Sequence, residues 1–152
     1  MKRVFSSSSD AETRAIGAEI AGLLPAPRLL ILSGDLGAGK TTLVKGIVQA
    51  LQAEDEDAVT SPTFSLVHSY EGWWDGRAVT VLHLDLYRLE DERQVSSLGI
   101  HDWMTEDTLI LVEWGEKFRL IQELADGSIQ IASTGPESRS ITVEWNEPNK
   151  PA

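Results

Sequence analysis

Residues 34–41 read GDLGAGKT and match the phosphate-binding loop pattern G-x-x-x-x-G-K-[ST] at every fixed position. The apolar run 29–33 precedes the loop, as expected for a parallel strand covered on both faces, and residues 42–51 follow it with apolar side chains at helical spacing. In a strand, glycine loop and helix of this order, backbone N–H groups and the helix N-terminus point at an anion. The sequence therefore predicts an α/β fold that binds a nucleoside triphosphate.

The residues of the loop contribute to that site in different ways. Gly34, Gly37 and Gly39 have no Cβ, so the backbone can approach a phosphate closely. Lys40 supplies a positive charge for the outer phosphates, and the Thr41 hydroxyl can coordinate Mg²⁺. The alternative is a chance match on a glycine-rich turn, and the flanking strand and helix argue against it.

The rest of the chain alternates between strand and helix patterns. Residues 9–12 have the Ser-x-x-Glu form of a capping box, and a first helix follows them. Another helix is predicted over residues 90–98, ending at Gly99. Further strands are predicted over residues 65–70, 79–85 and 108–113, with residues 71–77 joining the first two as a hairpin.

Near the C-terminus, apolar and polar residues alternate as in an antiparallel hairpin with one buried face. The apolar positions are Ile129, Ile131, Ile141, Val143 and Trp145, and the turn is predicted at Gly135 and Pro136. Together these patterns predict a P-loop NTPase-like fold: a central, mostly parallel sheet flanked by helices, with antiparallel strands that include this C-terminal hairpin.

The length and charge of the chain limit what else it can do. The chain has 152 residues, and we expect residues 1–146 to form a single P-loop ATPase domain and residues 147–152 a flexible tail. Its net charge of −11 argues against a broad basic surface for nucleic acid, so any work on nucleic acid is expected through a partner. There is no cysteine and no apolar run long enough for a membrane helix, so a cytoplasmic location is expected.

A phosphate loop needs further groups before it can hydrolyse a nucleotide. An acid at the carboxyl end of a neighbouring strand commonly holds Mg²⁺, and Asp85 and Glu113 both follow apolar strands. Either acid, taken alone, could instead begin a loop or cap a helix. Thr63 lies in the segment SPTF, residues 61–64, in a place where triphosphatase switches commonly sense the γ-phosphate, although the segment could be only a turn.

Four motifs together closely resemble those of the TsaE (YjeE) family. They are residues 34–42 (GDLGAGKTT), 61–64 (SPTF), 83–89 (HLDLYRL) and 112–117 (VEWGEK), in the family's order and spacing. The resemblance implies a Mg²⁺-dependent P-loop ATPase that works with the proteins TsaB and TsaD to form the threonylcarbamoyl group on the tRNA adenosine next to the anticodon. It also implies that TsaD performs the transfer, that an ATP-driven step in this chain sustains turnover, and that tRNA is met only through the complex.

The resemblance also assigns roles to individual residues. Those expected to cradle the phosphates are Gly37, Ala38, Gly39, Lys40, Thr41 and Thr42. Thr41 and Glu113 would bind Mg²⁺, and Asp85 would support the metal or orient water. Lys40, Asp85, Glu113 and Thr63 are the expected catalytic residues.

Three further expectations come from the resemblance. Trp114 would lie close to the nucleotide, and the N-terminal segment near Asp10 would close over the adenine. Residues 118–124 lack a proline that many relatives have, so the family pattern does not define the geometry of that segment.

Other function classes use the same loop. A small-molecule or nucleotide kinase is the main alternative, but a kinase usually has an arginine-bearing lid, and the arginines here are scattered. A GTPase would carry an Asn-Lys-x-Asp element, which the sequence lacks. A third alternative is a nucleotide-sensing subunit, in which hydrolysis only sets the timing of association with a partner. This alternative overlaps with the function that the TsaE resemblance implies. The histidines have no companion ligands, and His83 is expected to be a packed core residue rather than a catalytic base.

Overall fold

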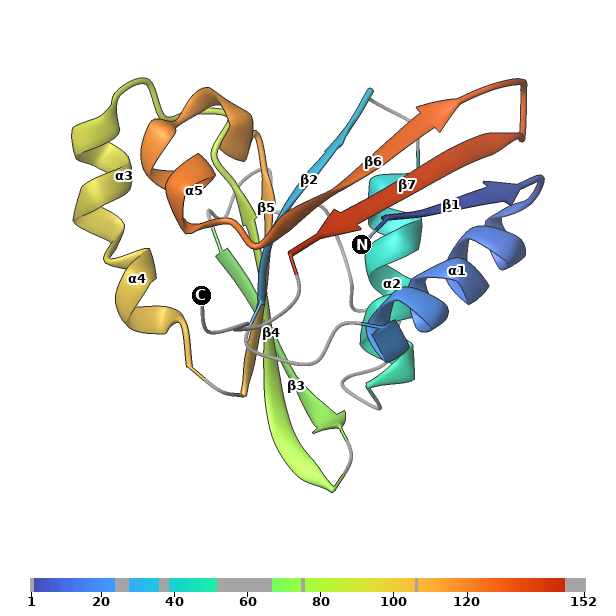
Figure 1. Ribbon diagram of the computed structural model, residues 1–152, viewed down its shortest axis with the longest axis horizontal. Helices are drawn as coiled ribbons and strands as arrows, with labels where there is room; N and C mark the ends of the chain where they lie inside the picture. Colours follow the sequence, from blue (N-terminus) through green and yellow to red (C-terminus); the bar gives the residue numbers. More distant parts are fainter. Residues whose placement is uncertain are drawn as a thin grey trace.

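A seven-stranded sheet runs through the molecule, and helices cover both of its faces (Figure 1). The computed structural model describes residues 2–23, 28–35, 39–51, 67–74, 76–105 and 107–146. The elements in chain order are β1 (Lys2–Ser7), α1 (Asp10–Leu23), β2 (Arg28–Gly34), α2 (Lys40–Ala50), β3 (Val67–Trp74), β4 (Arg77–Asp85), α3 (Glu92–Leu98), α4 (Ile100–Trp103), β5 (Thr108–Glu113), a 3-10 helix (Gly115–Lys117), α5 (Arg119–Leu124), β6 (Gly127–Ser133) and β7 (Arg139–Trp145).

The sheet has a parallel centre and antiparallel edges. Its strand order is β1-β7-β6-β2-β5-β4-β3. β6, β2, β5 and β4 pair in parallel, whereas β1, β7 and β3 pair antiparallel with their neighbours. The predicted fold class, including the C-terminal hairpin, is confirmed. Because parallel strands end at the same edge, the loop after β2 and the residues that end β4 and β5 are brought to one side of the sheet.

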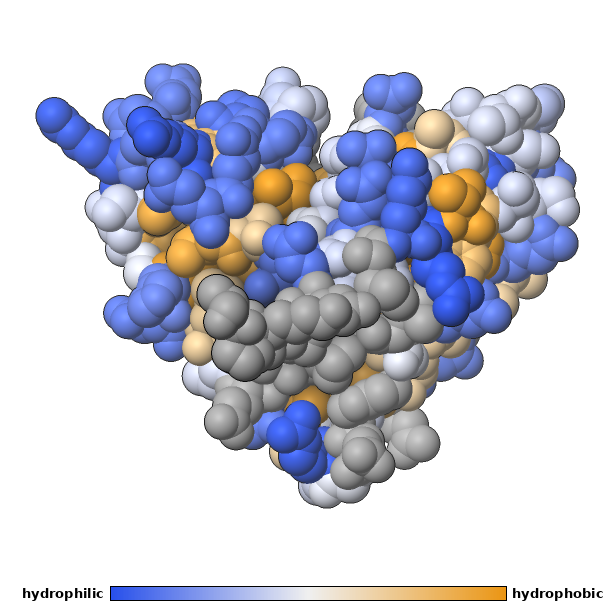
Figure 2. Space-filling model, in the orientation of Figure 1, coloured by the Kyte–Doolittle hydropathy of each residue, from blue (hydrophilic) through white to orange (hydrophobic). Residues whose placement is uncertain are grey.

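The alternation of side chains along β5 explains the two layers of helices. Leu109 and Leu111 pack in the core beneath α1 and α2, whereas Ile110 and Val112 pack in the core beneath α3, α4 and α5. All residues of β5 are buried, which is why this strand reads as a continuous apolar run. Figure 2 shows hydrophilic side chains over most of the coloured surface of this view, with apolar side chains in the region of α4 and α5 and again in the region of β1.

The hairpin between β3 and β4 is tighter than the sequence predicts. Glu71 pairs with Thr80 and Trp73 with Ala78, so the strands extend almost to the turn. Most of residues 71–77 are therefore paired between β3 and β4. Gly76 has φ of 78°, and this left-handed conformation lets the chain reverse within a short connection. The N-terminal residues add β1 at the opposite edge, and residues 119–124 form the short helix α5.

Two glycines allow α1 and α2 to cross in close contact. A Cβ on Gly17 would overlap the carbonyl oxygen of Leu43, and a Cβ on Gly46 would overlap that of Arg14. Both obstacles are backbone atoms, so neither can turn aside as a side chain would. The contact brings α1 against the helix that follows the phosphate loop.

Gly46→Ala is therefore expected to destabilise the protein by about 1–3 kcal/mol through overpacking, although alanine normally favours a helix. Urea denaturation followed by circular dichroism measures this. Gly22→Ala is the matched control in α1, because a Cβ there meets no atom within 4 Å. Equal stability of the two variants would show that the helices do not approach as closely as described.

Candidate functional site

The phosphate loop joins the end of β2 to the start of α2. Gly39 precedes α2 as its N-cap, with φ of 103° and ψ of 20°, a left-handed conformation that favours glycine. Thr41 and Thr42 lie in the first turn of α2 and are partly buried. Gly37 and Ala38 lie outside the described residues, so their predicted phosphate contacts stay predictions.

Lys40 places its ammonium group between β2 and β5. Its Nζ donates to the carbonyl oxygen of Gly34 at 2.8 Å and lies 3.2 Å from Oε1 of Glu113. The Lys40 side chain is only 15% exposed, so the pair is largely shielded from solvent. The structure thus joins the loop lysine to one of the two predicted acids.

Glu113 ends β5 and is buried, with two partners for its carboxylate. Oε2 lies 2.6 Å from Nε2 of His83, and Oε1 faces Lys40. Burial by itself raises the pKa of the Glu113 carboxyl, but the His83 hydrogen bond and the charge of Lys40 outweigh it and hold this pKa below its ordinary value. Glu113 is therefore ionised at neutral pH and can act as an oxygen ligand for a divalent cation.

Asp85 ends β4 directly beside Glu113 in the sheet. The two residues are register partners in the parallel pairing of β4 and β5, so their side chains project from the same face. Asp85 Oδ1 also accepts a hydrogen bond from the backbone N–H of Tyr87 at 2.9 Å. Asp85 therefore begins a loop, as one reading of the sequence allowed, and still lies at the edge where the metal acid is expected.

The start of α1 and the β6–β7 hairpin lie beside Gly39, the residue that precedes α2. The nearest atoms to a Cβ placed on Gly39 are Ile131 Cδ1 at 3.3 Å, Arg139 Nε at 3.8 Å and Thr13 Cγ2 at 3.9 Å. Asp10 is exposed at the first residue of α1, one turn before Thr13. The structure thus brings the N-terminal segment beside the loop, and the predicted adenine contact of Asp10 stays a prediction.

Arg139 is placed differently from what the sequence suggests. It counts among the scattered arginines in the sequence, yet the fold brings it beside Gly39. Its Nη1 donates to the carbonyl oxygens of Ser138 at 2.9 Å and Gly135 at 3.3 Å, so its guanidinium is bound to its own hairpin. The chain reversal between β6 and β7 produces this proximity, which no local pattern indicates.

Trp114 follows Glu113 in an unusual backbone conformation. Its φ of 65° is the only positive φ at a non-glycine residue in the described part of the chain. Its ring centroid lies 5.1 Å from that of Tyr87, which follows Asp85 two residues later, and both rings are exposed. The structure thus places Trp114 beside Glu113, at the edge of the sheet where the two acids lie.

Thr63 lies outside the described residues, and its role in a switch stays a prediction.

The oxygen donors at this edge fit magnesium. In the described ranges, no three His, Cys, Asp or Glu side chains are grouped so that they could hold a metal ion by themselves. Mg²⁺ typically binds through one or two carboxylates together with waters and substrate phosphates, so a closed protein cage is not required. Glu113 and Asp85, which end neighbouring parallel strands, offer hard oxygen ligands of this kind, and Thr41 carries a further hydroxyl oxygen in the first turn of α2.

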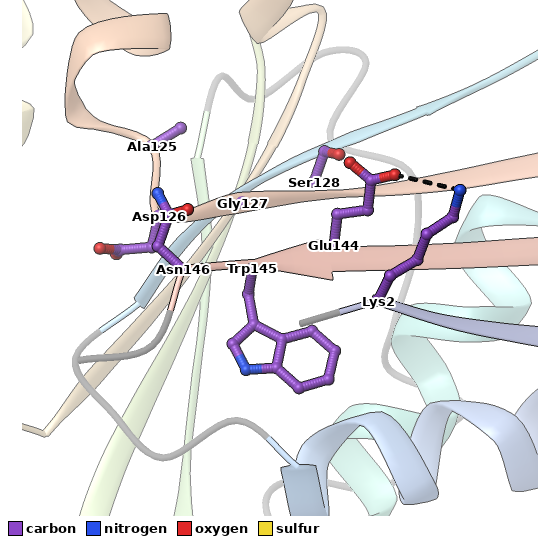
Figure 3. Close-up of a pocket in the computed structure, with 8 residues that line it drawn as sticks. All are labelled: Lys2, Ala125, Asp126, Gly127, Ser128, Glu144, Trp145 and Asn146. Carbon is purple, nitrogen blue, oxygen red and sulfur yellow. Dashed lines mark ion pairs between the residues drawn. The ribbon is translucent and has the colours of Figure 1, made fainter.

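A hollow of about 410 Å³ lies at the far end of β6 from the phosphate loop. Gly127 pairs with Leu30 at that end, whereas Ile131 pairs with Gly34 at the loop end. Figure 3 shows Lys2 and Glu144 at its rim, joined by an ion pair of 3.6 Å. None of the predicted site residues lines this hollow.

His83 makes a contact in the site that the sequence does not predict. It is fully buried, as predicted, but it also holds a carboxylate oxygen of Glu113. A signal was available, because His83 lies two residues before Asp85 in the same strand, and such residues point to the same face of a sheet.

The fold and this edge of the sheet define an α/β protein of the P-loop NTPase-like class. A family model described as "Threonylcarbamoyl adenosine biosynthesis protein TsaE" matches residues 7–148, and the chain belongs to this TsaE family.

Individual relatives agree with the family assignment. The TsaE protein of Streptomyces coelicolor is 37% identical over 139 residues, which cover 86% of this chain and 88% of the relative. The TsaE protein of Haemophilus influenzae is 39% identical over 103 residues, which cover 68% of this chain and 61% of the relative. The crystal structure of YdiB from Bacillus subtilis superimposes with a TM-score of 0.68 at 26% identity, covering 95% of this chain and 86% of that chain. Among the described residues, no helix has the length and apolar character that crossing a membrane requires.

Proposed function

We propose that this protein binds and hydrolyses Mg-ATP, and that it does so in forming the threonylcarbamoyl group on the tRNA adenosine next to the anticodon. The contact of Lys40 with Glu113, at the mouth of a glycine loop and at the carboxyl edge of parallel strands, carries the proposal of an ATP site. The family model and the names of the relatives support the pathway. TsaB and TsaD are the proposed working partners.

Each group at the edge has a proposed task. Lys40 and the backbone N–H groups of the loop hold the phosphates, and the Thr41 hydroxyl and Glu113 carboxylate hold Mg²⁺. Mg²⁺ held by these residues would supply positive charge against the charge that develops on the phosphate oxygens during hydrolysis. Asp85, on the neighbouring strand, orients the water or supports the metal shell.

The kinase alternative is separated from this proposal by the phosphate acceptor. An ATPase releases inorganic phosphate when water is the only acceptor, whereas a kinase of small molecules or nucleotides needs a second substrate for efficient turnover. The test is ATP turnover by the purified chain, measured alone and with TsaB and TsaD added. Phosphate release that rises with the partner proteins supports the proposal, and turnover that requires a small-molecule acceptor would favour the kinase.

We also expect the chain to act on tRNA only through its partners. With a net charge of −11, the isolated protein should bind tRNA more weakly than the ~10⁻⁴–10⁻⁶ M typical of non-specific nucleic-acid binding. Filter binding at moderate salt, together with ATP turnover with and without tRNA, measures this. TsaB and TsaD, by contrast, should stimulate turnover. Tight binding of free tRNA, or stimulation of ATP turnover by tRNA alone, would contradict the expectation that the chain acts on tRNA only through its partners.

A further inference from the structure

The two carboxylate oxygens of Glu113 have partners of different kinds. Oε1 lies 3.2 Å from the Lys40 ammonium, which belongs to the phosphate loop and is 15% exposed. Oε2 lies 2.6 Å from Nε2 of His83, whose side chain is completely buried. Oε1 therefore faces the place expected for the phosphates, and Oε2 faces the buried His83 on β4.

His83 has one polar anchor in the described part of the structure, and that anchor is Glu113. Its Nδ1 is buried and has no hydrogen-bond partner among the described residues. An ionised carboxylate only accepts hydrogen bonds, so Nε2 carries the proton and donates it to Oε2. The ring itself is held in β4, where His83 is the register partner of Leu111 in β5.

We propose that His83 is a positioning residue for the metal site: it holds Oε2 of Glu113 so that Oε1 alone is presented to Mg²⁺. The proposal rests on the proposed Mg-ATP site and adds that the two oxygens of the Glu113 carboxylate have different roles. When a nucleotide phosphate takes Lys40, Oε1 loses its partner and becomes free for the metal, while Oε2 keeps its hydrogen bond to His83. The carboxylate thus does not have to be reoriented when the nucleotide arrives.

A purely structural role for His83 makes a different prediction. A packed histidine contributes to stability, and its replacement would lower the melting temperature without changing how nucleotide affinity depends on Mg²⁺. A positioning residue acts on the metal, because partners that orient ligands commonly change metal affinity by 10–100-fold. The dependence of ADP affinity on Mg²⁺ separates the two roles, and ADP affinity in EDTA serves as the reference.

The experiment compares His83→Gln with His83→Asn. The glutamine amide nitrogen can occupy the position of Nε2 and donate to Oε2, whereas the asparagine amide is too short to reach it. His68→Asn is the matched control, because His68 is the register partner of His83 on β3 and its Nδ1 lies 3.4 Å from the Tyr70 hydroxyl oxygen. ADP affinity is titrated for each variant in EDTA and over a range of Mg²⁺ concentrations.

For His83→Asn we expect the Mg²⁺ concentration that half-maximally tightens ADP binding to rise about 10–100-fold, with ADP affinity in EDTA unchanged. His83→Gln and His68→Asn should stay close to the unsubstituted protein. In the nucleotide-free protein, ¹⁵N spectra of the imidazole should show a proton on Nε2. If His83→Asn does not fold, His83→Gln and the spectra decide.

An unchanged Mg²⁺ requirement in folded His83→Asn, an equal loss in His83→Gln, or a proton on Nδ1 alone would each overturn the role of His83. In all three cases the unsubstituted protein still binds Mg-ADP, so the proposed function would stand. Absence of nucleotide binding in the unsubstituted protein would overturn the proposed function, and the role of His83 with it.

Discussion

Lys40→Ala is expected to lower ATP turnover by about 10²–10³-fold, the usual cost of removing one preorganised group that stabilises transition-state charge. Lys40 Nζ contacts the Gly34 carbonyl and the Glu113 carboxylate rather than the apolar core, so the secondary structure should persist. Phosphate release and far-ultraviolet circular dichroism on the same preparation measure both effects. A folded Lys40→Ala protein with normal turnover would remove the basis for the ATP site.

Two further variants separate catalysis from stability in that experiment. Lys45→Ala changes a partly buried lysine of the same helix and should leave turnover unchanged. Lys40→Ala leaves the buried Glu113 carboxylate with His83 as its remaining partner among the described residues, and an uncompensated buried charge is destabilising. A double substitution, Lys40→Ala with Glu113→Gln, removes both charges and should be more stable than Lys40→Ala while remaining inactive.

Glu113→Gln is expected to raise the Mg²⁺ concentration needed for tight nucleotide binding by more than the 10–100-fold typical of an outer-shell partner. The reason is that Glu113 is the buried, ionised acid beside Lys40, and the substitution removes a charge that would contact the metal directly. Titration of nucleotide affinity against Mg²⁺ measures this.

Asp85→Asn is the paired variant, because Asp85 is the register partner of Glu113 on the neighbouring strand. It should mainly lower turnover, by about 10²-fold or more if Asp85 orients the attacking water as a general base does. Its Mg²⁺ requirement should change less than that of Glu113→Gln. A larger Mg²⁺ shift in Asp85→Asn than in Glu113→Gln would exchange the roles of the two acids.

Local patterns predicted most of the elements of the fold. β5 has apolar side chains buried on both faces, so its sequence is a continuous apolar run, and α2 follows the glycine loop at the predicted place. The hairpin of β3 and β4 differs from the predicted connection over residues 71–77, because Gly72 lies within the ladder opposite Val79 rather than in a loop. A glycine in a sequence does not distinguish a strand position from a turn position, since its conformation depends on the partner strand.

The positions of the two acids in the site could also be predicted from the sequence. Asp85 and Glu113 each end an apolar segment, and parallel strands bring their carboxyl ends to one edge, so their proximity follows from the fold class. The motifs also match the family to which the chain belongs. Thr63, Gly37 and Ala38 lie outside the described residues, so their roles rest on those motifs alone.

The sequence by itself determined the family, the glycine loop with Lys40, and the edge of the sheet where the acids lie. Each motif and each strand end is a short local pattern, and parallel strands bring their carboxyl ends to one edge. Only the tertiary structure decided that Glu113 shares its oxygens between Lys40 and His83, and that Arg139 lies beside Gly39. His83 and Glu113 are 30 residues apart and belong to different strands. Their hydrogen bond depends on strand register and side-chain direction, which long-range packing sets.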